Sequence, residues 1–238
     1  MSLPGWSGFM EEATQRNPYE HSRVLCLPFI NGPPSQFDTI VTTIRTSKRK
    51  CETFNMKTCF VTFDQPLYIK AQEIFSNNLE FKDIVVRLGG FQTLMSYMGA
   101  IGTIMTESCL KELFQSIYAL NTVDKLVSGH AYARAVRCHG LAHRVRDQFI
   151  METVSFSEEA KAVIESMFTS IDETALLKAD ENEIVQIFTT KFKEAVQKLE
   201  RRGPTAKLWV QYFHMTTLIK QFIEAERLGN WDLHITTI

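Results

Sequence analysis

Two short apolar runs, Thr58-Cys-Phe-Val-Thr-Phe63 and Ile84-Val-Val-Arg-Leu88, bracket the segment Asp64-Gln-Pro-Leu-Tyr-Ile-Lys-Ala-Gln-Glu-Ile-Phe75. Both runs are rich in β-branched and aromatic residues, are too short for core helices, and end at residues that break a strand, which is typical of parallel strands. The order strand, helix, strand predicts a parallel α/β unit. The carboxylate of Asp64 would then lie at the carboxyl end of its strand, the sheet edge where sites are usually built.

Upstream of this stretch, the sequence predicts another strand and another helix. The strand candidate is Arg23-Val-Leu-Cys-Leu-Pro28, and the helix follows from apolar residues at helical spacing over residues 37–44. Ser35 or Asp38 could cap this helix, and its basic end Ser47-Lys-Arg-Lys50 suits the helix dipole. The predicted order is strand, helix, strand, helix, strand.

After Leu88 the pattern becomes helical. Gly99 and Gly102 lie one turn apart in an apolar segment, which indicates a buried helix that another backbone approaches closely. We therefore expect residues 1–89 to form an α/β unit and residues 90–238 to form a helical domain. The expected helices are Phe91 to about Tyr118, Asn121 or Thr122 to about Thr153, Ala160 to Phe168, a helix that ends at Lys198 to Arg202, and Thr205 to Leu228.

Composition describes a globular, intracellular protein. The chain has 238 residues, is 45% hydrophobic and carries a formal net charge of −1, so affinity for nucleic acid must come from local clusters of basic residues. Its five cysteines are widely spaced without a C-x-x-C pair, which favours a reducing compartment over a disulfide framework. We expect no secretory signal and no membrane partner, because no stretch reaches the roughly 18 apolar residues of a span.

Asp64 is the strongest candidate for catalysis. A carboxylate at a strand end can hold a divalent metal when other carboxylates converge on it. The alternative is structural, because Asp64 is a good N-cap for a helix that has Pro66 in its first turn. Both roles stay open at this point, and one residue can serve both.

A basic stripe is the strongest candidate for binding. At 100° per residue, the side chains of His130, Arg134, Arg137 and Arg144 fall within about 80° of one helix face. Such a stripe could bind phosphates, and the alternative is a solvated face that pairs with acids of neighbouring helices.

The sequence contains a further weak metal-binding pattern but none of the large catalytic motifs. His139 and His143 are spaced i, i+4 beside Cys138, and a metal site there would need a third convergent ligand. The sequence lacks G-x-G-x-x-G, P-loop, G-x-S-x-G and H-E-x-x-H motifs, which argues against several enzyme classes.

Four segments of the chain carry a resemblance to a known group of sequences. They are Ile30-Asn-Gly-Pro-Pro-Ser35, Thr62-Phe-Asp-Gln-Pro-Leu-Tyr-Ile-Lys-Ala71, Val85 to Gly102, and Gly129-His-Ala-Tyr-Ala-Arg-Ala-Val-Arg137. These segments resemble transposon-like open reading frames that are abundant in invertebrate genomes, and those frames are similar to transposases with a ribonuclease-H-like catalytic domain of the Asp, Asp, Glu type. The resemblance covers most of the chain, although Gln92 replaces the histidine that is usual in the related frames.

The resemblance implies a partial ribonuclease-H-like three-layer unit followed by a helical insertion domain. Asp64 would match the second acid of the catalytic set, and the first acid and the glutamate have no counterpart in this chain. The expected protein is therefore catalytically incomplete, needs no cofactor, and binds DNA, a protein partner or a second copy of itself, with the nucleus as a candidate compartment.

The alternatives are a pure protein-interaction scaffold and an active nuclease or strand transferase. The nuclease would use Asp64 with Mg²⁺ and would need other acids in space, for which Glu80, Asp83 and Asp232 are the candidates.

Overall fold

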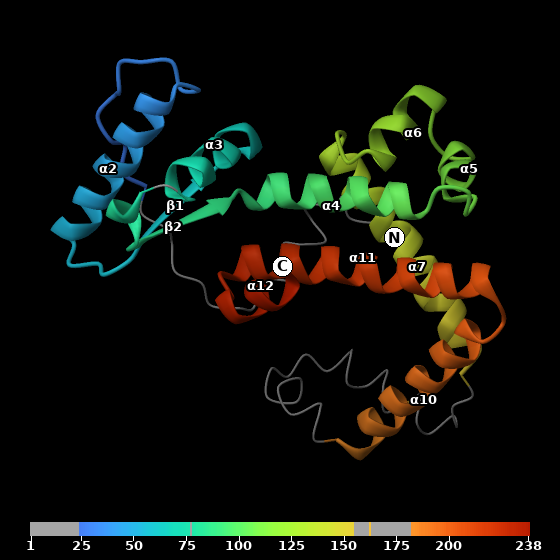
Figure 1. Ribbon diagram of the computed structural model, residues 1–238. Coiled ribbons are helices and arrows are strands. Elements are labelled where there is room, and N and C mark those ends of the chain that lie inside the picture. Colours follow the sequence, from blue (N-terminus) through green and yellow to red (C-terminus); the bar gives the residue numbers. More distant parts are fainter. Residues whose placement is uncertain (1–23, 77, 155–161, 163–181) are drawn as a thin grey trace. The chain divides into compact units, whose positions relative to one another are not determined.

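A computed structural model of the chain describes residues 24–76, 78–154, 162 and 182–238, and most of these residues are helical (Figure 1). The described chain divides into two compact units, one that ends at Met98 and one that runs from Gly99 to Ile238. Both strands belong to the first unit, and the described residues of the second form only helices and their connections. The predicted order, α/β followed by all-α, is confirmed at this level.

The first unit is built on the parallel strands β1 (Cys59–Phe63) and β2 (Ile84–Leu88), as the sequence predicts. Their register pairs Cys59 with Ile84 and Phe63 with Leu88. Around the strands lie the helices α2 (Phe37–Thr53) and α3 (Gln65–Ser76) and the 3-10 turn η1 (Leu79–Phe81). The predicted strand, helix, strand order from residue 58 to residue 88 is therefore confirmed.

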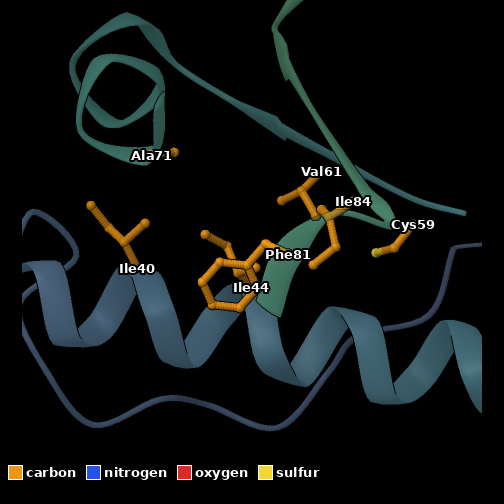
Figure 2. Close-up of a cluster of buried hydrophobic side chains, with 7 residues drawn as sticks. All are labelled: Ile40, Ile44, Cys59, Val61, Ala71, Phe81 and Ile84. Carbon is orange, nitrogen blue, oxygen red and sulfur yellow. The ribbon is translucent and has the colours of Figure 1, made fainter. Parts of the chain in front are cut away.

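One face of the two strands is buried against α2 and α3 (Figure 2). Ile40 and Ile44 are four residues apart on α2, so they share the helix face that covers this core. They meet Ala71 of α3 and the inward residues of both strands, because successive side chains of a strand alternate between its faces. The core cluster consists of Ile40, Ile44, Cys59, Val61, Ala71, Phe81 and Ile84.

The predicted strand at Arg23–Pro28 is wrong. Residues 24–30 form neither strand nor helix, and the side chains of Val24 and Phe29 are 85% and 91% exposed. A strand needs a hydrogen-bonded neighbour, and among the described residues β1 and β2 pair only with each other. Residues 24–28 therefore have no strand to pair with in the described chain, despite their β propensity. Neither predicted cap residue caps α2, whose N-cap is Gln36, and Asp38 lies in the first turn.

The helix α4 (Gly90–Ile104) follows β2 directly, and the division between the two units falls within it. The predicted division at residue 89 stays a prediction. From Gly99 onward the second unit contains α5 (Leu110–Gln115), α6 (Leu120–Val127), α7 (Tyr132–Glu152), α10 (Glu183–Glu200), α11 (Pro204–Leu228) and α12 (Trp231–Thr237).

Two long helices predicted for residues 90–238 are each broken into two. The segment from Phe91 to Tyr118 is interrupted after Ile104, where Glu107 and Cys109 adopt left-handed backbone angles of φ 67° and 65°. The segment from Asn121 to Thr153 is interrupted at Gly129, whose φ is 77°. A helix cannot continue through these left-handed residues.

Helix α11 is the centre of packing in the second unit, since it contacts α7, α10 and α12. Its predicted end is confirmed, because Gly229 follows Leu228 with a left-handed φ of 64°, a conformation that suits glycine at the end of a helix. One core cluster joins three of these helices and contains Ile150, Val196, Leu199, Val210 and Phe213.

Three further points concern the helices of the chain. The helix predicted from Ala160 to Phe168 lies outside the described residues apart from Ala162. The short helix α12 was not predicted. No described helix combines the length and the apolar character that crossing a bilayer requires.

Candidate nucleic-acid interface and the strand edge at Asp64

Asp64 lies directly after β1, at the carboxyl edge of the two-stranded sheet, as predicted. Its Oδ1 accepts a hydrogen bond of 3.2 Å from the backbone N–H of Leu67, and its carbonyl accepts one of 2.8 Å from Tyr68. Pro66 occupies the first turn of α3, where its missing N–H costs nothing. The cap role considered for Asp64 is therefore confirmed.

The other candidate acids of the first unit, Glu80 and Asp83, come before β2, at the opposite edge of the sheet. Asp83 precedes β2, and its carbonyl accepts a hydrogen bond from the N–H of Cys59 at the start of β1. The five residues of β1 separate this edge from Asp64 by about 15 Å. Asp232 belongs to α12 in the second unit.

Glu80 and Asp83 are also engaged with cations of α2. Arg45 donates two hydrogen bonds, of 2.9 and 2.8 Å, to the carboxylate of Glu80, and Lys48 lies 3.8 Å from Asp83. The guanidinium of Arg45 lowers the pKa of Glu80. No three His, Cys, Asp or Glu side chains in the described parts of the chain are placed to hold one metal ion.

Helix α7 has one buried face and one exposed face. Its buried residues Ala135, Val136, His139 and Ile150 pack into the second unit. On the other side, Arg134, Arg137 and Arg144 are all exposed. The predicted basic face of this helix therefore holds for the three arginines.

His130 does not belong to this face, and its assignment to the helix is wrong. The helix begins at Tyr132, and His130 lies in the preceding turn, where its Nδ1 is 3.0 Å from the hydroxyl of Ser128. The left-handed backbone at Gly129 breaks the helical spacing on which the prediction rested.

The three arginines form no ion pair with an acid of the described residues. The described ion pairs of the second unit involve Lys111 with Asp124 and His234 with Glu226. The pairing with neighbouring acids that the sequence left open is therefore not found in the part of the chain that the structure describes.

Apolar side chains share the exposed face with the arginines. At 100° per residue, Leu141 and Val145 fall between or beside the arginine positions, and Phe149 lies at the margin of the face. Their side chains are 46%, 67% and 45% exposed. We call these six residues, Arg134, Arg137, Leu141, Arg144, Val145 and Phe149, the outer face of α7.

His139 and His143 are core residues that join α7 to α11. Nδ1 of His139 and the hydroxyl of Tyr212 share a hydrogen bond of 2.9 Å, and Nε2 of His143 and the hydroxyl of Thr217 share another of 2.9 Å. The ring of His143 also stacks on Phe213 with centroids 4.5 Å apart. Burial lowers the pKa of each histidine to about 4, so both are neutral near pH 7.

These contacts replace the metal site that the i, i+4 spacing left open. Cys138 is also buried, and burial raises the pKa of its thiol to about 12, which disfavours the thiolate that a metal would need. With no third ligand among the described residues, the pair serves helix packing.

The structure also shows a cavity of about 450 Å³ that sequence reasoning missed. Arg146 of α7, Arg202 and Gly203 of the α10–α11 turn, and Trp209 of α11 contribute to its lining. The only signal in the sequence is the junction Arg201-Arg202-Gly203-Pro204, which marks a helix end and a helix start. A cavity between three helices cannot be inferred from that junction alone.

Comparison with known proteins places the chain in a family without transferring a function to it. No curated protein and no solved structure matches the sequence. One family model matches residues 5–238, nearly the whole chain, and its description is a domain of unknown function, DUF8702. The chain is therefore a member of the DUF8702 family.

Proposed function

We propose that this protein binds duplex DNA through the outer face of α7 and does not cleave it, as a descendant of a transposase that has kept binding without catalysis. The observation that carries the proposal is the exposure of Arg134, Arg137 and Arg144 on one helix face without an acid partner among the described residues. Cations left unpaired on one face are available to phosphates.

The spacing of the arginines suits a phosphate backbone. Arg134 and Arg144 are ten positions apart, which is about 15 Å along the helix axis. Successive phosphates of one strand advance about 3.4 Å along the duplex axis, so this face spans several of them. The planar guanidinium is also the side chain best suited to phosphate, because it donates two parallel hydrogen bonds.

The ancestry part of the proposal rests on the first unit. A ribonuclease-H-like domain would place an acid after one parallel strand and follow it with a helix and a neighbouring strand, and Asp64 with β1, α3 and β2 has this order. Two-metal strand transfer requires several converging carboxylates. Asp64 has none of its candidate partners at its edge of the sheet, so we propose binding without Mg²⁺-dependent cleavage. The nucleus would then be the compartment where it acts.

The test is binding of labelled duplex DNA by fluorescence anisotropy across a salt series. Three arginine–phosphate contacts predict that log K falls against log salt with a slope of about −2.7. Changing Arg134, Arg137 and Arg144 together to alanine should remove most of the affinity and most of the slope. The matched control removes the same charge from other exposed positions of the second unit, as Lys193→Ala, Lys198→Ala and Lys207→Ala together, and should bind like the unchanged protein.

A protein partner is the second candidate, because Leu141, Val145 and Phe149 add exposed apolar surface to the same face. Apolar anchors beside arginines are typical of protein interfaces. If no duplex binding appears at low salt, or if the control variant loses as much affinity as the arginine variant, the DNA proposal fails and the protein candidate replaces it.

A further inference from the structure

The cavity at the junction of α7, α10 and α11 has the size and lining of a small-molecule site. Its volume of about 450 Å³ lies within the range of roughly 300 to 1,000 Å³ that is usual for ligand pockets. Apolar side chains form part of its wall, and its polar residues include two cations. The residues that matter for the argument are Arg146, Phe149, Leu199, Arg202, Thr205 and Trp209.

The electrostatic character of the cavity is positive. Arg146 and Arg202 both line it, and no aspartate or glutamate occurs among its described lining residues. Neither arginine forms an ion pair within the described parts of the chain. Burial lowers the pKa of Arg146. Its positive charge is thus partly buried, and no carboxylate of the described lining residues balances it.

Arg146 is the partly buried cation of this lining. Its Nε atom is buried and has no hydrogen-bond partner among the described residues, which is unusual because buried donors are nearly always paired. Its guanidinium lies over the ring of Trp209, with Cζ 5.0 Å from the ring centroid. This contact holds the guanidinium at the cavity, and Nε is left without a hydrogen-bond partner among the described residues.

The first turn of α11 adds further donors to the same lining. Gly203 is the N-cap of this 25-residue helix and has no side chain with which to cap it. Pro204, Thr205 and Ala206 follow, and the N–H groups of Thr205 and Ala206 have no partner within the helix. Arginines and backbone N–H groups at a helix start both favour an anion with several oxygens, which is the character of a phosphate group.

We propose that this cavity binds a small phosphate monoester that carries a planar ring. Arg146, Arg202 and the start of α11 hold the phosphate, and Phe149, Leu199 and Trp209 contact the ring. The site is separate from the three arginines of the outer face of α7, although Phe149 belongs to both. It goes beyond the proposed DNA binding, because the ligand is a free monoester and not a diester within a duplex.

The test is isothermal titration calorimetry of the full chain with phenyl phosphate, and with phenol and inorganic phosphate as half-ligands. The adjacent residues Arg201 and Arg202 give a matched pair, since both are exposed and only Arg202 lines the cavity. Arg202→Gln should weaken phenyl phosphate binding about tenfold or more, because it removes a charge-assisted hydrogen bond. Arg201→Gln should bind like the unchanged protein, and circular dichroism checks that both variants are folded.

Three results would overturn the proposal. The first is the absence of saturable heat with phenyl phosphate up to about 10 mM, well above the Kd of even a weak site. The second is equal binding by Arg201→Gln and Arg202→Gln. The third is a loss of duplex binding in Arg202→Gln as large as that of the triple arginine variant, which would make the cavity part of the DNA surface. The first two results leave the proposed DNA binding intact.

Discussion

The buried histidines of α7 show how much the surroundings of a residue decide its chemistry. From the i, i+4 spacing alone, His139 and His143 look like a pair of metal ligands. In the structure each is paired with a hydroxyl of α11 at 2.9 Å, and His139 is only 1% exposed. The same spacing that would aim two ligands at a metal aims two rings at a neighbouring helix.

This burial predicts a pH dependence of stability. Because the pKa of His139 is about 4 in the folded chain and near 6.5 when unfolded, the unfolded state alone takes up a proton between these values. The free energy of unfolding should therefore be highest above about pH 6.5. As the pH drops toward 4, His139 should lower it by about 3 kcal/mol. NMR titration of the imidazole signals checks the cause directly.

In that titration, both rings should stay neutral at pH 5.5 in the folded chain. The same chain in urea is the control, and its histidines should titrate near 6.5. Protonation of His139 in the folded chain near pH 6.5 would contradict the prediction.

At the scale of elements, the close contact of α4 with the turn between α6 and α7 is the feature that the paired glycines predicted. A Cβ at Gly102 would overlap the carbonyl oxygen of Val127, and one at Gly99 would lie 3.1 Å from that of Ser128. Both neighbours are backbone atoms. The closer position can be relieved only if the helix or the turn moves.

Gly102→Ala should therefore lower the free energy of unfolding by about 2 kcal/mol, a typical cost of forcing an extra carbon into a packed contact. Gly99→Ala is the matched control, since it makes the same change in helix propensity one turn away, which by itself favours alanine by about 1 kcal/mol. Urea unfolding followed by circular dichroism measures both. Equal stabilities for the two variants would contradict the prediction, because the turn would then move away from the added carbon at Gly102 without an extra energetic cost.

At this scale, the sequence predicts those elements that depend on a local pattern of residues. The strands β1 and β2, the helix between them and the cap at Asp64 all follow from short runs of residues. The break after Ile104 could not be foreseen, because Glu107 and Cys109 adopt left-handed angles that residues other than glycine rarely adopt, so no glycine marks the break in the sequence. The strand predicted at residues 23–28 failed because pairing is not a local property.

The candidate sites divide in the same way. The exposed arginines of α7 follow from a helical projection, which needs only one element. His130 was misplaced because the projection assumed an unbroken helix through Gly129. The cavity with Arg146 forms where three helices meet, and such a meeting cannot be predicted from any single stretch of sequence.

At the scale of the whole molecule, each of the two units has a core of its own. The cluster around Ile44 belongs to α2, α3, η1 and the two strands, and the cluster around Ile150 belongs to α7, α10 and α11. Both side chains are fully buried, at 0% exposure. Since no residue of either cluster is shared with the other, the two cores are expected to open separately.

Removing side-chain volume from one core should therefore loosen one unit. Ile44→Ala and Ile150→Ala should each cost about 2 to 5 kcal/mol by leaving a cavity where a buried side chain was. In amide hydrogen exchange measured by mass spectrometry, Ile44→Ala should speed exchange in α2, α3 and the strands and leave α7 and α11 unchanged. Ile150→Ala should do the reverse, so each variant controls for the other. If either change speeds exchange equally in both units, the prediction is wrong. The two cores would then open together, in one cooperative unfolding of the whole chain.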